Sequence, residues 1–278
     1  MALCAAAWLT VAEAYPFCWI FLALAQKPSV LQQDNWKFTN PCIDFLLYIL
    51  YDWHITRFIT WRTDMFFKYG EKETEYLKSK DKKLAEVIDK IGHIERQTDD
   101  NLFSSVIHCI IGQQISTKAQ ITIWQRMQDA CGEVTPETIN NISTEELQSL
   151  GMTFRKAEYI KDFAEKTTKG EFDIDAVVEM TDQEAIMALS GLKGIGVWTA
   201  EMILLFCLER PDILSYSDLA IQRGMRMVYH HRKIDKKLFE KYRRRLSPYC
   251  SVASLYFWAV AGGAVPGMKD YAPAKKVK

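Results

Sequence analysis

From Met65 onward the sequence repeats one pattern, in which a polar cap precedes an amphipathic stretch that ends at glycine or proline. The pairs Ser143–Glu146 and Thr181–Glu184 have the spacing of a capping box at a helix N-terminus. Alternating apolar and polar residues, which are typical of strands, are nearly absent. This pattern constrains the fold strongly and predicts an all-α domain of about ten helices.

Apolar periodicity and caps give approximate bounds for these helices. The stretch 101–111 is the most apolar, so we expect it at the centre of the domain. The predicted helices are 81–91, 101–111, one starting at Ser116, one at Pro136, 143–151, 154–168, 182–189, 197–208, 219–230, 236–246 and 252–261.

The first 64 residues differ in kind from the rest. They hold five of the eight tryptophans but only nine of the 70 charged side chains, and neither caps nor a helical period run through them. A membrane anchor, an accessory segment and translated sequence upstream of the true start are the alternatives, and we favour the third. We therefore divide the chain into a poorly ordered hydrophobic extension at 1–64, a helical domain at 65–263 and a disordered basic tail at 264–278.

Charge and cysteine content exclude several classes of protein. The formal net charge is zero, which argues against a uniformly basic surface. Residues 232–245 nevertheless hold eight Lys or Arg, either as phosphate contacts or as a solvated helix face. None of the seven cysteines has the spacing of a zinc or iron–sulfur site, so we expect no metal ligands among them. Scattered free thiols favour a reducing, cytoplasmic location.

A Gly-x-Gly turn joins two of the predicted helices, at Gly194 and Gly196. Glycine suits the turn because the turn demands a positive φ and because a side chain would keep nucleic acid away. The bare N–H groups that begin the second helix can bind a phosphate oxygen. The order helix–turn–helix excludes a dinucleotide-binding fingerprint, which needs a strand before its turn.

Asp218 follows one helix downstream of this turn and begins the next predicted helix. Its carboxylate could act on a nucleotide that the turn holds, or it could be a plain N-cap, and both roles are compatible.

The hairpin Leu192–Ala200, Asp218, the run Ile111–Ser116 and the run Phe154–Tyr159 together resemble the helix-hairpin-helix (HhH-GPD) DNA glycosylases. The likeness covers about residues 65–263 and is greatest to the DNA-3-methyladenine glycosylase II branch. It implies a two-lobed helical fold with the active-site cleft between the lobes, in which the first and last helices share one lobe.

The resemblance also implies a monofunctional, monomeric enzyme that flips alkylated purines, chiefly 3-methyladenine, out of double-stranded DNA and hydrolyses the N-glycosidic bond. No cofactor is required, a structural cation at the hairpin is possible, and no stable membrane partner is expected. The implied residues are the following: Asp218 for catalysis; Trp198 and Tyr216 for the base pocket; Gln113, Gln114 and Ile115 for the wedge that fills the gap; and Lys193, Gly194, Gly196, Val197 and Arg223 for other DNA contacts.

The sequence departs from other branches of that family in two places. Trp198 stands where relatives that cut the DNA backbone carry a lysine, so we expect no lyase activity. The chain also lacks the four-cysteine loop of the iron–sulfur branches. The alternatives are a glycosylase for another damaged base, a non-catalytic DNA-binding module, or a membrane-tethered protein through residues 1–26.

Overall fold

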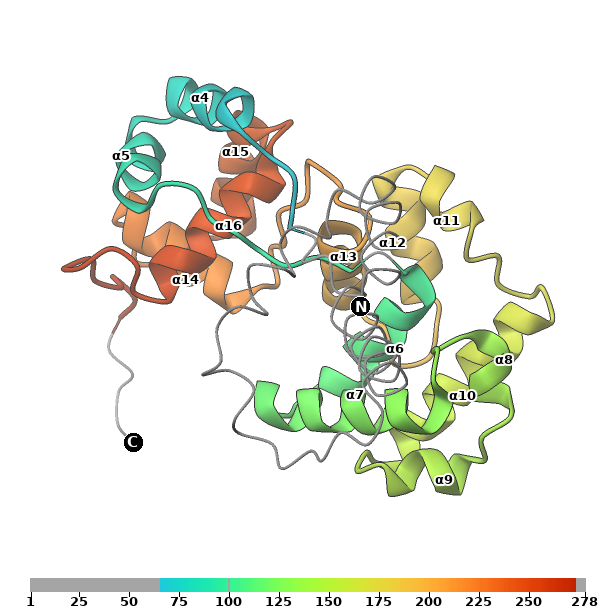
Figure 1. The fold of residues 1–278 in the computed structure, drawn as a ribbon. Helices are drawn as coiled ribbons and strands as arrows, with labels where there is room; N and C mark the ends of the chain where they lie inside the picture. The colour runs from blue at the N-terminus through green and yellow to red at the C-terminus, as the bar shows by residue number, and fades with distance from the viewer. Residues whose placement is uncertain (1–65, 100, 274–278) are drawn as a thin grey trace, which may run out of the picture. The chain divides into compact units, whose positions relative to one another are not determined.

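The computed structural model describes residues 66–99 and 101–273, and the predictions for 1–64 lie outside these ranges. Contacts divide the chain after Thr63, so all described residues belong to the second unit. Within them, regular structure consists of helices and one isolated antiparallel bridge between Phe66 and Gln97. The predicted all-α class is confirmed (Figure 1).

Thirteen helices occur in the described residues. They are α4 (Glu71–Lys80), α5 (Lys82–Ile91), α6 (Leu102–Gly112), α7 (Thr117–Cys131), α8 (Pro136–Asn140), α9 (Thr144–Ser149), α10 (Phe154–Thr168), α11 (Ala176–Glu179), α12 (Asp182–Ser190), α13 (Val197–Phe206), α14 (Leu219–Tyr229), α15 (Lys236–Leu246) and α16 (Cys250–Ala261).

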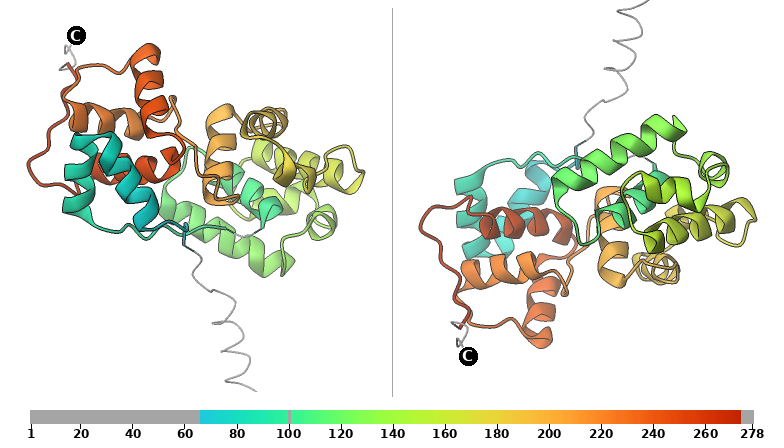
Figure 2. Two further views of the ribbon diagram at one scale, coloured as in Figure 1. Left: turned by 90° about the horizontal axis from the view of Figure 1, so that it is seen from above. Right: turned by 90° about the horizontal axis from the view of Figure 1, so that it is seen from below.

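The helices pack in two groups. Helices α4, α5, α14, α15 and α16 contact one another, while α6 to α13 are linked by contacts through α6, α10, α12 and α13 (Figures 1 and 2). The chain therefore leaves the first group after α5 and returns to it with α14. At the centre of the first group, α14 and α16 cross so closely that a Cβ on Gly224 would overlap the backbone of Phe257.

The predicted caps hold because they depend on neighbours only three residues away. Both capping boxes form, at Ser143–Glu146 and at Thr181–Glu184. Helix α13 ends two residues before the predicted end, with Cys207 as its C-cap. Two helices escaped prediction: α4 is mostly charged, with Leu77 as its buried residue, and α11 is only four residues long.

The C-terminal segment corrects the expected disorder for residues 264–273. The Asp270 carboxylate accepts two hydrogen bonds from the Arg226 guanidinium on α14, at 2.8 and 2.6 Å. An acidic residue inside the basic tail thus supplies the charge that anchors it. Residues 274–278 lie outside the described ranges.

Two observations on the described residues bear on membrane tethering and on cysteine chemistry. None of the helices in residues 66–99 and 101–273 has the length and apolar character needed to cross a membrane. Cys109 is partly buried, and burial raises the pKa of its thiol to about 12, so it is a poor nucleophile.

Candidate active site

The Gly-x-Gly turn connects α12 to α13, as predicted. Gly194 has φ +83°, and a Cβ there would overlap the ring of Tyr159. Gly196 has φ −92° and faces open space. The two glycines therefore serve different purposes: the backbone and Tyr159 require the first, while the second leaves the surface of the turn bare.

The first turn of α13 offers backbone donors to the outside. Gly196 is the N-cap and has no side chain that could cover the N–H groups behind it. Val197 is 54% exposed. These donors lie at the positive end of the helix dipole, which favours an anion such as a phosphate.

Asp218 lies against this turn. Its side chain is buried, and its Oδ2 accepts a hydrogen bond of 2.9 Å from the indole Nε1 of Trp198. Its Oδ1 accepts a bond of 2.8 Å from the backbone N–H of Ile221. Asp218 is thus the N-cap of α14 and also a direct neighbour of the hairpin. Both carboxylate oxygens are satisfied, as a buried carboxylate requires.

The bond from Trp198 is a feature that sequence reasoning missed. We predicted a stacking face for a base, and the indole is indeed 45% exposed, but its N–H is committed to Asp218. Another exposed apolar side chain, Leu219, follows Asp218 directly and is 80% exposed. The sequence signal that could have marked Leu219 is an apolar residue at the first position of a helix, directly after the N-cap Asp218.

Tyr216 lines a neighbouring cavity of about 640 Å³. Its ring packs edge-on against Phe239 at 5.1 Å between centroids. The other lining residues come from α12, α13, the connection before α14, and α15: Asp182, Gln183, Ile186, Val197, Glu201, Asp212, Ile213, Leu214, Ser217, Lys236, Phe239, Glu240 and Arg243. Trp198 and Asp218 are not among them, so this cavity does not join Tyr216 to Trp198, its predicted partner in the base pocket, or to the predicted catalytic Asp218.

Glu201 is the unusual acid of this cavity. Burial raises the pKa of its carboxyl, a hydrogen bond with Ser215 opposes that rise, and the nearby Asp218 adds to it. Its Oε2 is buried without a hydrogen-bond partner.

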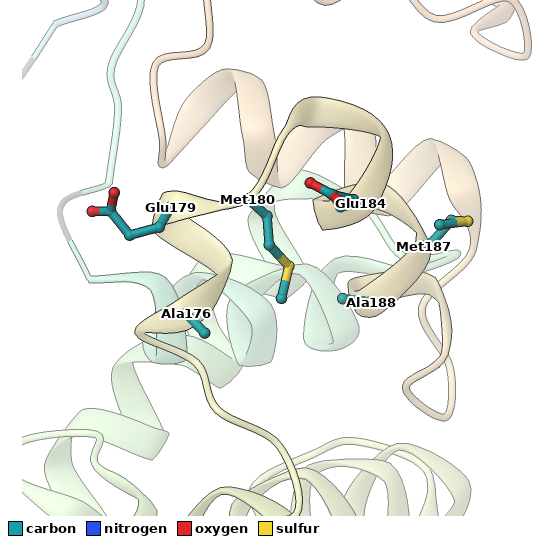
Figure 3. Close-up of a pocket in the computed structure, with 6 residues that line it drawn as sticks. All are labelled: Ala176, Glu179, Met180, Glu184, Met187 and Ala188. Carbon is teal, nitrogen blue, oxygen red and sulfur yellow. The ribbon is translucent and has the colours of Figure 1, made fainter.

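A second depression of about 500 Å³ lies between α11 and α12 and contains none of the predicted site residues. Figure 3 shows its lining side chains, which are two carboxylates, two alanines and two methionines. Of the two carboxylates, that of Glu184 accepts hydrogen bonds from Thr181 in the capping box of α12.

The predicted wedge is the loop between α6 and α7. Gln114 is exposed with φ +57°, and Ile115 is 37% exposed, so both side chains are available to a ligand. Gln113 differs, because its Nε2 donates a hydrogen bond of 2.7 Å to the carbonyl of Gly194. It ties the wedge loop to the hairpin.

The predicted phosphate-contacting cations have protein partners. The Lys193 ammonium lies 2.5 Å from the carboxylate of Asp162. Arg223 lies 4.0 Å from Asp270 and remains half exposed.

In the basic stretch 232–245, two arginines have structural partners. Arg245 pairs with the buried Asp81 at 2.8 Å, and Arg243 lies 3.7 Å from Asp212. The six other cations are exposed: Arg232, Lys233, Lys236, Lys237, Lys241 and Arg244.

Neither the side chains nor the hairpin backbone presents a ready-made metal site within the described ranges. Within residues 66–99 and 101–273, no three His, Cys, Asp or Glu side chains gather as a metal site would need. A cation at the hairpin would have to use backbone carbonyls of residues 191–196, which are hard oxygen ligands. The carbonyl of Leu192 already accepts from Ile195, and that of Gly194 from Gln113, so the cation stays a prediction.

Several known proteins are similar to this chain in sequence or fold. The chain is similar to the putative DNA-3-methyladenine glycosylase YfjP of Bacillus subtilis, at 30% identity over 58% of this chain and 59% of that protein. A crystal structure of DNA-3-methyladenine glycosidase from Bacillus halodurans matches at TM-score 0.67 and 32% identity, covering 74% of this chain and 97% of that one. The structure of a Schizosaccharomyces pombe 3-methyladenine DNA glycosylase with abasic DNA matches at TM-score 0.61 and 27% identity, over 69% and 97% of the two chains.

A sequence profile describing HhH-GPD base excision DNA repair proteins matches residues 107–248, which contain the wedge loop, the hairpin and Asp218. With the helical fold and these relatives, the match establishes that the chain belongs to the HhH-GPD superfamily of base excision DNA repair proteins.

Proposed function

We propose that this protein is a monofunctional DNA glycosylase that hydrolyses the N-glycosidic bond of alkylated purines, 3-methyladenine among them. One observation carries the proposal: the buried carboxylate of Asp218 is held by the indole N–H of Trp198, in the first turn after the hairpin. The names of the B. subtilis, B. halodurans and S. pombe relatives support the substrate class.

The chemistry needs a fixed negative charge. Breaking the bond between C1′ and the base builds positive charge on the deoxyribose, as in glycoside hydrolysis. A preorganised carboxylate opposite that charge stabilises the transition state, and it can also accept a proton from the attacking water. An N-alkylated purine is itself cationic and leaves readily, so the site needs no strong general acid.

Recognition rests on three elements. The bare N–H groups of the α13 N-terminus bind a phosphate, and the exposed Gln114 fills the stack after the damaged nucleotide has rotated out. The exposed face of Trp198 attracts a cationic base by about 1–2 kcal/mol when water is excluded. We expect double-stranded DNA to bind between the two helix groups and the protein to act as a monomer.

Hydrolysis without a lyase step follows from Trp198. An indole cannot form a Schiff base with the abasic sugar, and the nearby Lys193 is paired with Asp162. Strand cleavage by the purified protein on abasic DNA would contradict this part of the proposal.

Asp218→Asn tests the function. Asparagine preserves the N-cap of α14 but removes the charge, so the fold should survive while release of 3-methyladenine from methylated duplex falls on the order of 10²–10³-fold. Affinity for abasic-site DNA should remain. If the wild-type protein released hypoxanthine or 8-oxoguanine and no 3-methyladenine, a glycosylase for another damaged base would be favoured. Unchanged release of 3-methyladenine by Asp218→Asn would exclude Asp218 from the mechanism.

A further inference from the structure

One face of α10 contacts both elements that the proposed function assigns to DNA. Lys156, Tyr159 and Asp162 follow one another at helical spacing on this face. Lys156 reaches the wedge loop, Tyr159 packs at Gly194 of the hairpin, and Asp162 pairs with Lys193 of the hairpin. The run Phe154–Tyr159, which the sequence singled out, begins this helix.

Lys156 makes the contact with the wedge loop. Its ammonium donates hydrogen bonds to two backbone carbonyls, that of Ile111 at 2.9 Å and that of Gln113 at 2.6 Å. These carbonyls lie at the C-terminus of α6, where the helix dipole is negative and the last carbonyls have no helical partner. The group is part-buried, and burial lowers the pKa of Lys156.

The loop is also fixed from the other side. The backbone carbonyl of Gln113 accepts a hydrogen bond from Lys156. The side-chain amide of Gln113 in turn donates to the Gly194 carbonyl. Lys156, Gln113 and Gly194 therefore form a continuous chain of hydrogen bonds from α10 through the wedge loop to the hairpin. The next residue of the loop is the exposed Gln114.

We propose that Lys156 is a positioning residue, whose bonds to the Ile111 and Gln113 carbonyls hold the wedge loop in register with the hairpin. Its ammonium points at protein carbonyls, so it acts without contacting a DNA phosphate. The wedge then enters the duplex at a fixed step from the phosphate that the hairpin holds. This inference rests on the proposed function for its purpose, but its structural claim concerns DNA distortion and not base release.

Helix α10 supplies a matched control. Lys161 also donates to three backbone carbonyls, those of Ile139, Asn140 and Ile142 at 2.9–3.3 Å, at the end of α8. Lys156→Met and Lys161→Met each remove one lysine that caps a helix end. Only the first touches the wedge loop.

The experiment measures binding of the full-length protein to two duplexes, one undamaged and one with an abasic-site analogue beside 2-aminopurine, whose fluorescence rises on unstacking. For Lys156→Met we expect affinity for the abasic duplex to fall about 10- to 100-fold, as for lost hydrogen bonds from a charged donor, with loss of the fluorescence rise. Affinity for undamaged duplex and its salt dependence should stay unchanged. Lys161→Met should match the wild type in all four measurements.

Three results would overturn the proposal. A slope of log association constant against log salt concentration that is shallower by about 0.9 in Lys156→Met would make Lys156 a phosphate contact. Equal losses in both lysine variants would reduce the effect to general stability. Unchanged unstacking in Lys156→Met would show that the loop needs no such support.

Two further readouts keep the test decisive. If Lys156→Met does not fold, Gln113→Leu cuts the same chain of hydrogen bonds at the hairpin and must lose the fluorescence rise on the abasic duplex. The wild-type protein could unstack the abasic duplex and yet release no 3-methyladenine from a methylated duplex. That result would contradict the proposed function and leave this inference unaffected.

Discussion

Replacing Trp198 by phenylalanine separates the two roles of this side chain. Phenylalanine keeps an aromatic face for the base but removes the Nε1–H that donates to Asp218 Oδ2 at 2.9 Å. The substitution therefore leaves the Asp218 carboxylate in place, but its Oδ2 loses the hydrogen-bond donor. We expect the catalytic rate to respond more than the affinity for substrate.

The magnitude follows from the geometry. A hydrogen bond to a charged group contributes about 1.5–3 kcal/mol net. The acceptor is buried but the indole is 45% exposed, so water can partly replace the lost donor and the lower part of that range applies. About 1.5–2 kcal/mol corresponds to a loss of about 10- to 30-fold in kcat. The weaker attraction of phenylalanine for a cationic base adds about 0.5–1 kcal/mol, which appears in KM.

Single-turnover release of 3-methyladenine from a methylated duplex gives the rate, and a double-mutant cycle with Asp218→Asn shows where the loss arises. If the indole acts through the carboxylate, Trp198→Phe should slow the Asp218→Asn variant much less than it slows the wild type. Equal slowing in both backgrounds would refute the reasoning and assign Trp198 to base stacking alone.

Two further predictions concern stability. Gly224→Ala should destabilise the fold by about 1–3 kcal/mol in urea unfolding, because its Cβ overlaps the Phe257 backbone; stabilisation, the ordinary result of Gly→Ala in a helix, would contradict the close crossing of α14 and α16. For Glu201, burial raises the folded pKa above its unfolded value of 4.5, so the folded state binds more protons and stability falls as pH rises from 4.5 through the raised pKa. Glu201→Gln should abolish that fall and melt higher than the wild type at neutral pH; identical pH dependence of the two melting curves would show that Glu201 is not responsible.

Local interactions explain how much of the fold could be predicted. The bounds of α10 and α15 agree with the predicted 154–168 and 236–246, because a cap and an apolar stripe are set by residues within one or two turns. Helix α4 gives no such signal: it is predominantly charged, and what secures it is the packing of Leu77 against the rest of its group. The prediction of disorder near Asp270 was wrong because the contact that orders this segment is not local. The partner of Asp270, Arg226, lies 44 residues away.

The sequence by itself determined the helical class, the hairpin between α12 and α13, the N-cap at Asp218 and the likeness to DNA glycosylases. Tertiary structure alone decided that the Trp198 indole binds the carboxylate 20 residues away, and that Gln113 joins the wedge loop to a hairpin 81 residues further along. Caps and turns need only neighbouring residues, whereas these bonds depend on how whole helices pack and therefore on where each side chain points. A spacing along the chain cannot specify that direction.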